Sequence, residues 1–351
     1  MLTFTAPNDP ISQHVVRRSF SLDCFRAPQQ RMTIIRASWV RCGRASRLVE
    51  WRSMMTGSET PVLTETEQAV RIITLNRPHR LNALNGELIR GLARALDEAE
   101  ADEAVRVVVI TGSPRADGRQ CFSAGGDVHA QAEGGAEALG ERPHEIVRDV
   151  AGLYAGDFLG KQGGRATFYR ITTFPKIVIA AIGGVCVGGG LEVAMACDLR
   201  LVADTARIGD PHVKLHSFTS GGGLTNSLSR AIGPAKAKEL VLLGTLIDGN
   251  EAWRIGLANR VVAADRLMPE TMAMAHEISE RSPTATRMTK ALANAAPDIS
   301  QEQGLRFDAL AWSMQMTVRG GHYAGAQKFL DQRASAESGS PEEPRNWSLR
   351  S

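Results

Sequence analysis

The chain has 351 residues, of which 43% are hydrophobic and 23% charged, so it is long enough for one large globular domain or two ordinary ones. Its net charge of +3 is uneven, because residues 1–53 hold nine Arg, no Lys and three acidic residues and carry +6, which leaves −3 for the rest. The rest of the chain therefore offers no charge argument for a nucleic-acid partner. No apolar run approaches the roughly 18 residues of a membrane span. Five Cys without CxxC spacing argue against a disulfide framework or a metal site and favour a reducing compartment.

The two ends of the chain differ in composition from its middle. Residues 1–53 show no helical or strand period, and we expect an unstructured N-terminal extension over 1–55. Two explanations stay open: an over-extended start with initiation at Met54 or Met55, which predicts a cytoplasmic protein, or a transit peptide, which predicts the mitochondrial matrix. The Ser-, Glu- and Pro-rich residues 334–351 are predicted to be a disordered tail.

Regular patterns begin at residue 70. Residues 70–75 are predicted to form a strand, and Asn85 is predicted to cap a helix over 86–100, where apolar residues recur at three and four positions. The continuous apolar run at 105–111 predicts a strand buried on both faces. Two further strands are expected at 177–182 and 199–203, with a short helix beginning near Leu191 between them.

This alternation of strands and helices predicts an α/β core over residues 60–265. After Asp265 the strand patterns stop, and helices are expected at 269–281, 284–295, 301–317 and 325–332. Residues 266–333 are therefore predicted to form a C-terminal helical region.

Two glycine-containing segments each follow a predicted buried strand: FSAGGD at 122–127 and GGGLE at 188–192. Glycine lets backbone N–H groups approach a ligand closely, and a helix N-terminus adds unpaired donors. Two such groups aimed at one oxygen form an oxyanion hole, although each segment alone is compatible with an ordinary tight turn. Neither is a nucleotide-binding loop, and no GxSxG elbow is present. The regularly spaced Asp198, Asp204 and Asp210 are interpreted as loop and cap residues.

Longer motifs carry a resemblance to a known family. They are LNRPHRLNALN at 75–85, CFSAGGDV at 121–128, PKIVIAAIGGVCVGGGLEVAMACDLRLVADTARIGDPHVKL at 175–215, GPAKAKELVLLG at 233–244 and AWRIGLANRVV at 252–262. In this order they resemble the crotonase (enoyl-CoA hydratase/isomerase) family, over about residues 62–333. The resemblance implies an α/β fold made of a crotonase-like spiral of ββα turns, with a C-terminal helical oligomerisation region and a homotrimer or a dimer of trimers.

The resemblance also implies the site residues. By motif position the two oxyanion-hole N–H groups fall on Gly126 and Gly189, and Arg80 suits the phosphates of coenzyme A. The positions expected to contact substrate are Arg80, Ala83, Leu84, Ala124, Gly125, Asp127, Val128, Gly188, Pro211 and His216.

The expected acid–base pair departs from the family pattern. Family hydratases hold one water between two Glu; the first is retained as Glu192, and the second is replaced by His212. A Glu–His pair can still exchange protons near neutrality, so we expect Glu192 and His212 to be catalytic. Two alternatives stay open, that Glu192 is a partly exposed helix residue and that His212 is a loop histidine.

The sequence thus predicts a hydratase that acts on an acyl-CoA thioester through a stabilised enolate, with no cofactor beyond the coenzyme A of the substrate and with no metal, nucleic-acid or membrane partner. Three activities on the same scaffold remain open: an enoyl-CoA isomerase, an acyl-CoA hydrolase, and a carbon–carbon bond-forming enzyme like dihydroxynaphthoyl-CoA synthase, which the segment VKLHSFTSGGG at 213–223 resembles. A catalytically weak acyl-CoA binding protein is the alternative outside enzymes.

Overall fold

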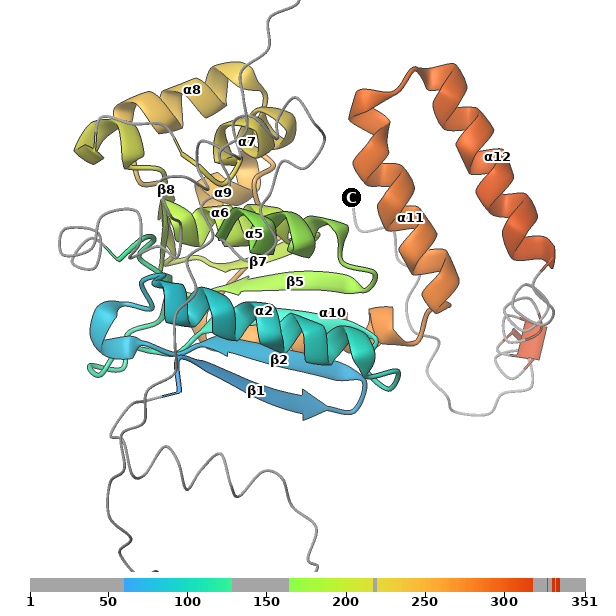
Figure 1. Ribbon diagram of the computed structural model, residues 1–351, viewed down its shortest axis with the longest axis horizontal. Coiled ribbons are helices and arrows are strands. Elements are labelled where there is room, and N and C mark those ends of the chain that lie inside the picture. Colours follow the sequence, from blue (N-terminus) through green and yellow to red (C-terminus); the bar gives the residue numbers. More distant parts are fainter. Residues whose placement is uncertain are drawn as a thin grey trace, which may run out of the picture. The chain divides into compact units, whose positions relative to one another are not determined.

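The computed structural model describes residues 60–127, 164–216 and 220–317, with a few positions between 327 and 334. The expected N-terminal extension and the end of the tail lie outside the described residues. Within them the fold is mixed α/β, with helices on both faces of a large sheet (Figure 1). No helix in these ranges is long and apolar enough to cross a membrane, and no cluster of His, Cys, Asp or Glu in them has metal-site geometry.

The large sheet has six strands in the order β1-β2-β3-β5-β7-β9. Only the β1–β2 pair is antiparallel; the other neighbours are parallel. The strands are β1 (Val62–Glu67), β2 (Val70–Leu75), β3 (Val107–Gly112), β5 (Ile177–Ile182), β7 (Leu199–Ala203) and β9 (Arg260–Val262). The strands predicted at 70–75, 177–182 and 199–203 are confirmed, and β3 begins two residues later than expected.

A second, three-stranded parallel sheet has the order β4-β6-β8. Its strands are β4 (Cys121–Ser123), β6 (Val185–Val187) and β8 (Arg207–Gly209), and each comes directly after a strand of the large sheet. The chain therefore repeats a β-β unit three times, with α6 (Gly189–Ala196) following the second, which is the expected spiral. The sequence patterns missed these strands because three residues are too few to show a period of two.

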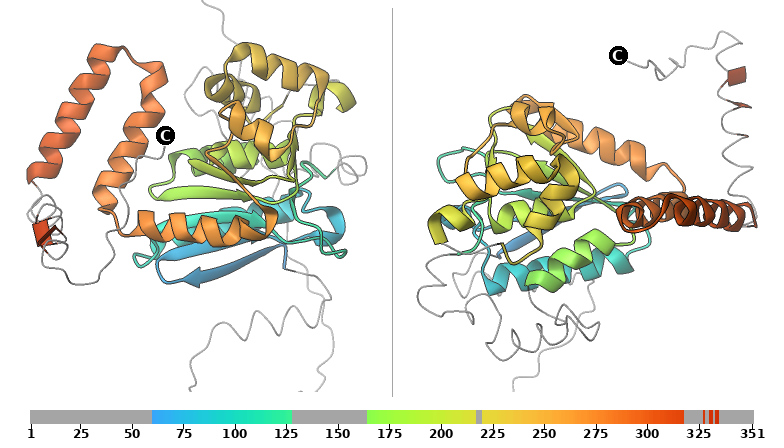
Figure 2. Two further views of the ribbon diagram at one scale, coloured as in Figure 1. Left: turned by 180° about the vertical axis from the view of Figure 1, so that it is seen from behind. Right: turned by 90° about the horizontal axis from the view of Figure 1, so that it is seen from above.

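The large sheet is covered on both faces, as the continuous apolar run of β3 predicted. Val108 and Ile110 belong to a core shared with α2 (Gly86–Ala101), α5 (Gly164–Thr173) and α6. Val107 and Val109 face the other way, onto α10 (Leu267–Ser279). Figure 1 shows α2 and α5 in front of the sheet, and Figure 2 shows α10 on the opposite face.

Helix boundaries follow local chemistry. Asn85 caps α2 as expected, because its side-chain oxygen accepts a hydrogen bond from Leu88 N at 2.9 Å. Helix α6 begins at Gly189, earlier than the predicted start near Leu191, so the second Gly of the triplet is already its first residue. Beyond β8 lie a π-helical turn (His212–His216), then α7 (Leu224–Ile232), α8 (Pro234–Leu243) and α9 (Gly249–Arg254), three helices that the sequence analysis did not predict.

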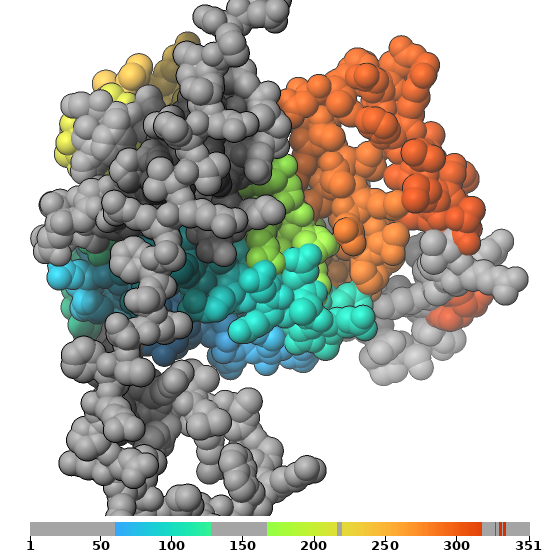
Figure 3. Space-filling model, viewed as in Figure 1, coloured from blue at the N-terminus to red at the C-terminus, as the bar shows by residue number. Residues whose placement is uncertain are grey.

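The C-terminal helices α11 (Pro283–Ala295) and α12 (Gln301–Thr317) pack against each other (Figures 1 and 2). Helix α11 is joined to the core by buried Lys290, whose ammonium group donates to Asp198 Oδ2 at 2.8 Å. Helix α12 buries only Ala311, and Figure 3 shows both helices at the surface. The large apolar side chains that α12 exposes are Leu305, Phe307, Leu310, Trp312, Met314 and Met316.

Candidate active site

Two glycine-rich segments from different parts of the chain meet at the start of α6. Leu84 N donates to Gly125 O at 2.7 Å and Asp127 N donates to Leu84 O at 3.0 Å, so these two bonds flank Gly126. In such a parallel bridge the amide between the two bonded residues points away from the partner strand. The N–H of Gly126 is therefore directed away from Leu84.

The amide of Gly189 lies close to that of Gly126. Gly189 is the first residue of α6, so its N–H has no acceptor within the helix. A Cβ built on Gly189 would stand 3.4 Å from Gly126 N, and a Cβ on Gly125 would stand 3.2 Å from Gly189 N. The segments can approach this closely only without side chains. Two amides beside one another at a helix N-terminus can hydrogen-bond one ligand oxygen and stabilise negative charge on it.

A buried asparagine holds the first segment in place. Asn82 has no exposed surface and a positive φ of 53°. Its side-chain nitrogen donates to Ser113 O at 2.8 Å and to Cys121 O at 3.0 Å, while its side-chain oxygen accepts from Arg77 N at 2.9 Å. The Ser123 hydroxyl donates to Asn82 O at 2.8 Å. These bonds fix the backbone of β4, just before Gly126, and of the loop around Asn82.

Asp127, an expected substrate contact, pairs with Arg77. Its Oδ2 lies 2.9 Å from Arg77 Nη1, which also donates to Ala83 O at 2.6 Å. Both side chains are largely buried. Asp127 thus ties the Gly126 segment to the loop before α2, and Arg77 is a supporting residue that the sequence analysis missed.

Glu192 lies in the first turn of α6 and is buried, with 8% of its surface exposed. Its Oε1 accepts hydrogen bonds from Gly222 N at 2.7 Å and from the Ser220 hydroxyl. Its Oε2 would stand 3.7 Å from a Cβ on Gly189, so this oxygen lies beside the paired amides. The alternative that Glu192 is a partly exposed helix residue is wrong, and Ser220 is a second supporting residue that the sequence did not reveal.

His212 begins the π-helical turn after β8. Its Nδ1 is 2.5 Å from Asp210 Oδ1, and its ring contacts the space beside Gly188, where a Cβ would stand 3.3 Å from Cε1 and 3.5 Å from Nε2. The hydrogen bond with Asp210 raises the pKa of His212; burial opposes this, and the charges of Asp210 and Glu192 reinforce it. The structure therefore places His212 next to the glycine triplet, with Glu192 close enough to act on its charge. The interpretation of Asp210 as a loop or cap residue overlooked this pair.

The other residues expected to contact substrate differ in how far they are buried. Ala83, Leu84 and Gly125 are buried beside the paired amides, Ala124 is half-buried, and Arg80 is exposed. Pro211 precedes His212 in the turn. Val128 and the side chain of His216 lie outside the described residues.

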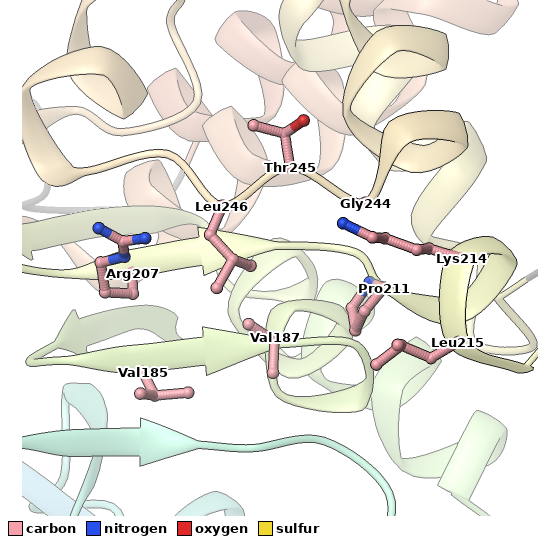
Figure 4. Close-up of a pocket in the computed structure, with 9 residues that line it drawn as sticks. All are labelled: Val185, Val187, Arg207, Pro211, Lys214, Leu215, Gly244, Thr245 and Leu246. Atoms are coloured by element: carbon pink, nitrogen blue, oxygen red, sulfur yellow. The ribbon is translucent and has the colours of Figure 1, made fainter.

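A hollow of about 580 Å³ lies on the face of the β4-β6-β8 sheet that is turned away from the main core (Figure 4). Val185 and Val187 of β6 line it, whereas Cys186 between them points into the core, because successive strand residues face opposite ways. Pro211 is the one expected site residue that it includes. This hollow is therefore distinct from the space beside Gly126 and Gly189.

Comparison with known proteins gives a consistent result. Residues 65–336 match the family model described as enoyl-CoA hydratase/isomerase. The chain is 36% identical over 273 residues to a probable enoyl-CoA hydratase of Mycobacterium bovis, covering 78% of this chain and 96% of that protein. It is 32% identical over 272 residues to a crotonyl-CoA hydratase of Syntrophomonas wolfei, covering 78% and 95%. The solved structure of an enoyl-CoA hydratase from Bacillus anthracis superposes with a TM-score of 0.66 at 28% identity, covering 78% of this chain and 96% of that one.

Proposed function

Because the chain belongs to the enoyl-CoA hydratase/isomerase family, we propose that it adds water to the carbon–carbon double bond of a 2-enoyl-CoA thioester. The observation that carries the proposal is the meeting of the Gly126 and Gly189 amides beside the Glu192 carboxylate, with the His212 ring against the neighbouring Gly188. These groups supply what the reaction needs: donors for the thioester oxygen and two side chains that exchange protons.

In the proposed mechanism the thioester carbonyl oxygen accepts hydrogen bonds from the N–H groups of Gly126 and Gly189. Glu192 Oε2 takes a proton from water as the hydroxyl oxygen bonds to C3 of the substrate. The electron pair of the double bond moves toward the thioester, and the paired amides stabilise the enolate oxygen. His212 gives a proton to C2, which completes the addition of one water. Glu192 returns its proton to His212, directly or through solvent.

The same reasoning extends to substrate binding and assembly. The exposed Arg80 next to Ala83 and Leu84 suits the phosphates of coenzyme A. The apolar side chains exposed on α12 favour a homotrimer or a dimer of trimers, because exposed large apolar side chains are stabilised by burial against another subunit. The cytoplasmic location and the absence of a cofactor stay predictions.

A second candidate is double-bond isomerisation at the same site. The replacement of the second family glutamate by His212 favours it, because moving a proton from C4 to C2 needs the enolate and one base but no bound water. Glu192 Oε2 is the base that this reaction would use.

The test incubates the purified full chain with crotonyl-CoA and with a 3-enoyl-CoA, and measures the enone absorbance and the product mass. Hydration of crotonyl-CoA lowers the absorbance, whereas isomerisation of the 3-enoyl-CoA raises it. Hydration adds the mass of one water and isomerisation leaves the mass unchanged. Glu192→Gln is the matched control. Binding of both thioesters without turnover of either would identify an acyl-CoA binding protein and refute the proposal.

A further inference from the structure

A buried carboxylate stands behind His212 and has no part in the mechanism so far. Asp210 has no exposed surface, and its Oδ1 lies 2.5 Å from His212 Nδ1. We infer that Asp210 is a positioning residue that fixes which ring nitrogen of His212 serves the site, so that the two residues act as one proton-transfer unit opposite Glu192. The inference rests on the proposed function for its catalytic consequence, although the geometry of the pair can be tested without turnover.

One carboxylate oxygen holds both the ring and the main chain of His212. Asp210 Oδ1 also accepts a hydrogen bond from His212 N at 3.1 Å. The intervening Pro211 limits the backbone between them. Since a carboxylate accepts and does not donate, Nδ1 must carry the proton of the shared bond. Proton exchange with a bound molecule then falls to Nε2.

The other edge of the ring lies beside the proposed oxyanion hole. Cε1 and Nε2 are the two ring atoms that a Cβ on Gly188 would meet first, at 3.3 Å and 3.5 Å, and Nδ1 would be at 3.9 Å. Gly188 directly precedes Gly189, whose amide is one of the two proposed donors. The ring of His212 thus lies between Asp210 and the triplet, with its Cε1–Nε2 edge nearest Gly188.

The charges around the pair favour a proton on His212. Asp210 Oδ2 is buried and has no hydrogen-bond partner within the described ranges, so its charge needs a neighbouring cation. The hydrogen bond to Asp210, and then the charges of Asp210 and Glu192, raise the pKa of His212 against the effect of burial. An imidazolium beside a carboxylate is a proton donor, which is the role that the mechanism gives it.

The other charged groups described near the turn leave the hydrogen bond between Asp210 and His212 intact. They are Lys214 on the turn itself and Lys236, Lys238 and Glu239 on α8, which packs against the turn; the side chain of His216 is not described. The stem of Lys214 lies against Gly244, as Figure 4 shows, and Lys236 pairs with Glu239 at 3.2 Å. Within the described ranges, Asp210 is the group whose hydrogen bond orients the ring of His212.

The direct test is Asp210→Asn in the full chain, with Asp204→Asn as the matched control. Asp204 is an aspartate six residues earlier whose Oδ1 accepts from Thr205 N, outside the proposed site. An Asn side chain keeps the size but removes the charge, and its amide can donate to Nδ1 and force the wrong tautomer. We expect kcat/KM on crotonyl-CoA to fall about 10²-fold or more at unchanged thioester binding, and the control to keep its rate.

Two further measurements separate positioning from simple stabilisation. In a pH profile the loss of kcat/KM on the alkaline side, where His212 gives up its proton, should move to lower pH in Asp210→Asn. His212→Gln and the double variant should be equally slow, because removing either member disables the unit. If Asp210→Asn lowers only the melting temperature, with rate and pH profile retained, Asp210 is structural and the inference fails.

Nitrogen-15 NMR of histidine-labelled protein tests the pair independently of turnover. Wild type should show His212 with a protonated Nδ1 and a higher pKa than in Asp210→Asn. This outcome without turnover of any enoyl-CoA would overturn the proposed function but keep the pair. Should Asp210→Asn not fold, the wild-type spectrum decides, and a His212 whose proton resides on Nε2 alone would overturn the inference.

Discussion

The substitution Glu192→Gln separates catalysis from folding and binding at this site. Gln has the size of Glu, and its amide oxygen can take the place of Oε1, where it would keep the hydrogen bonds from Gly222 N and the Ser220 hydroxyl. The amide nitrogen would replace Oε2 beside Gly189, and an amide nitrogen cannot take a proton from water. The variant should therefore fold normally and lose its base.

The expected magnitude follows from this single change. A general acid–base group contributes about 10²–10⁴-fold to the rate. At about 1.4 kcal/mol for each factor of ten, the loss corresponds to about 2.8–5.6 kcal/mol of transition-state stabilisation. Since the Gly126 and Gly189 amides are unchanged, the affinity for an acyl-CoA should stay within a few-fold of wild type.

The assay measures kcat and KM on crotonyl-CoA, the Kd of a non-reactive thioester by calorimetry, and the melting temperature. Ser220→Ala is the matched control, because it removes one bond to Oε1 but leaves the carboxylate, and its rate should lie between those of wild type and Glu192→Gln. Full turnover by Glu192→Gln would show that the carboxylate has no catalytic role. A large loss of thioester binding would show that it acts in binding instead.

Four other outcomes are expected. Gly222→Ala should lower both kcat and the melting temperature, because its Cβ would stand 2.6 Å from Glu192 Oε2 and from Cδ2 of the buried Phe168 and would displace the carboxylate; an unchanged kcat would contradict the proposed position of that oxygen. Lys290→Met should reduce the free energy of unfolding in urea by about 3–5 kcal/mol, because it leaves the largely buried Asp198 with the hydrogen bond from Val178 N but without its ion-pair partner; a loss below about 1 kcal/mol would count against that pair. Light scattering should report a trimer or hexamer for the wild type. This assembly should dissociate when the exposed apolar residues of α12 are replaced by Glu. A monomeric wild type at micromolar concentration would refute the role of α12. Folding raises the pKa of His212, so protonated His212 should contribute its full stabilisation below the unfolded-state pKa of about 6.5. This contribution should be lost as the pH rises through the folded-state pKa. If the difference in unfolding free energy between wild type and His212→Gln does not shrink with rising pH, the expectation is contradicted.

The sequence by itself determined the main elements and the two glycine-rich segments that meet at the start of α6. Asn85 predicts the start of α2 because capping acts over three residues, and β5 and β7 follow from apolar runs with turns at their ends. The resemblance to the family assigned Gly126 and Gly189 as expected donors by motif position, and the structure brings their segments together. These features depend on residues that are close together in the sequence, so they can be predicted from the sequence.

The tertiary structure alone decided which side chains support the site. Ser220 lies 28 residues from Glu192, and Asp127 lies 50 residues from Arg77, so no local period relates the members of either pair. Asp210 is the loop and cap residue that the sequence predicted, since its Oδ1 accepts from His212 N. Its pairing with the His212 ring was not predicted, because its burial and the direction of the ring depend on how the turn packs against the glycine triplet. Side-chain partners of this kind are set by long-range packing, which fixes burial and rotamer together, and a sequence shows the residue types without either.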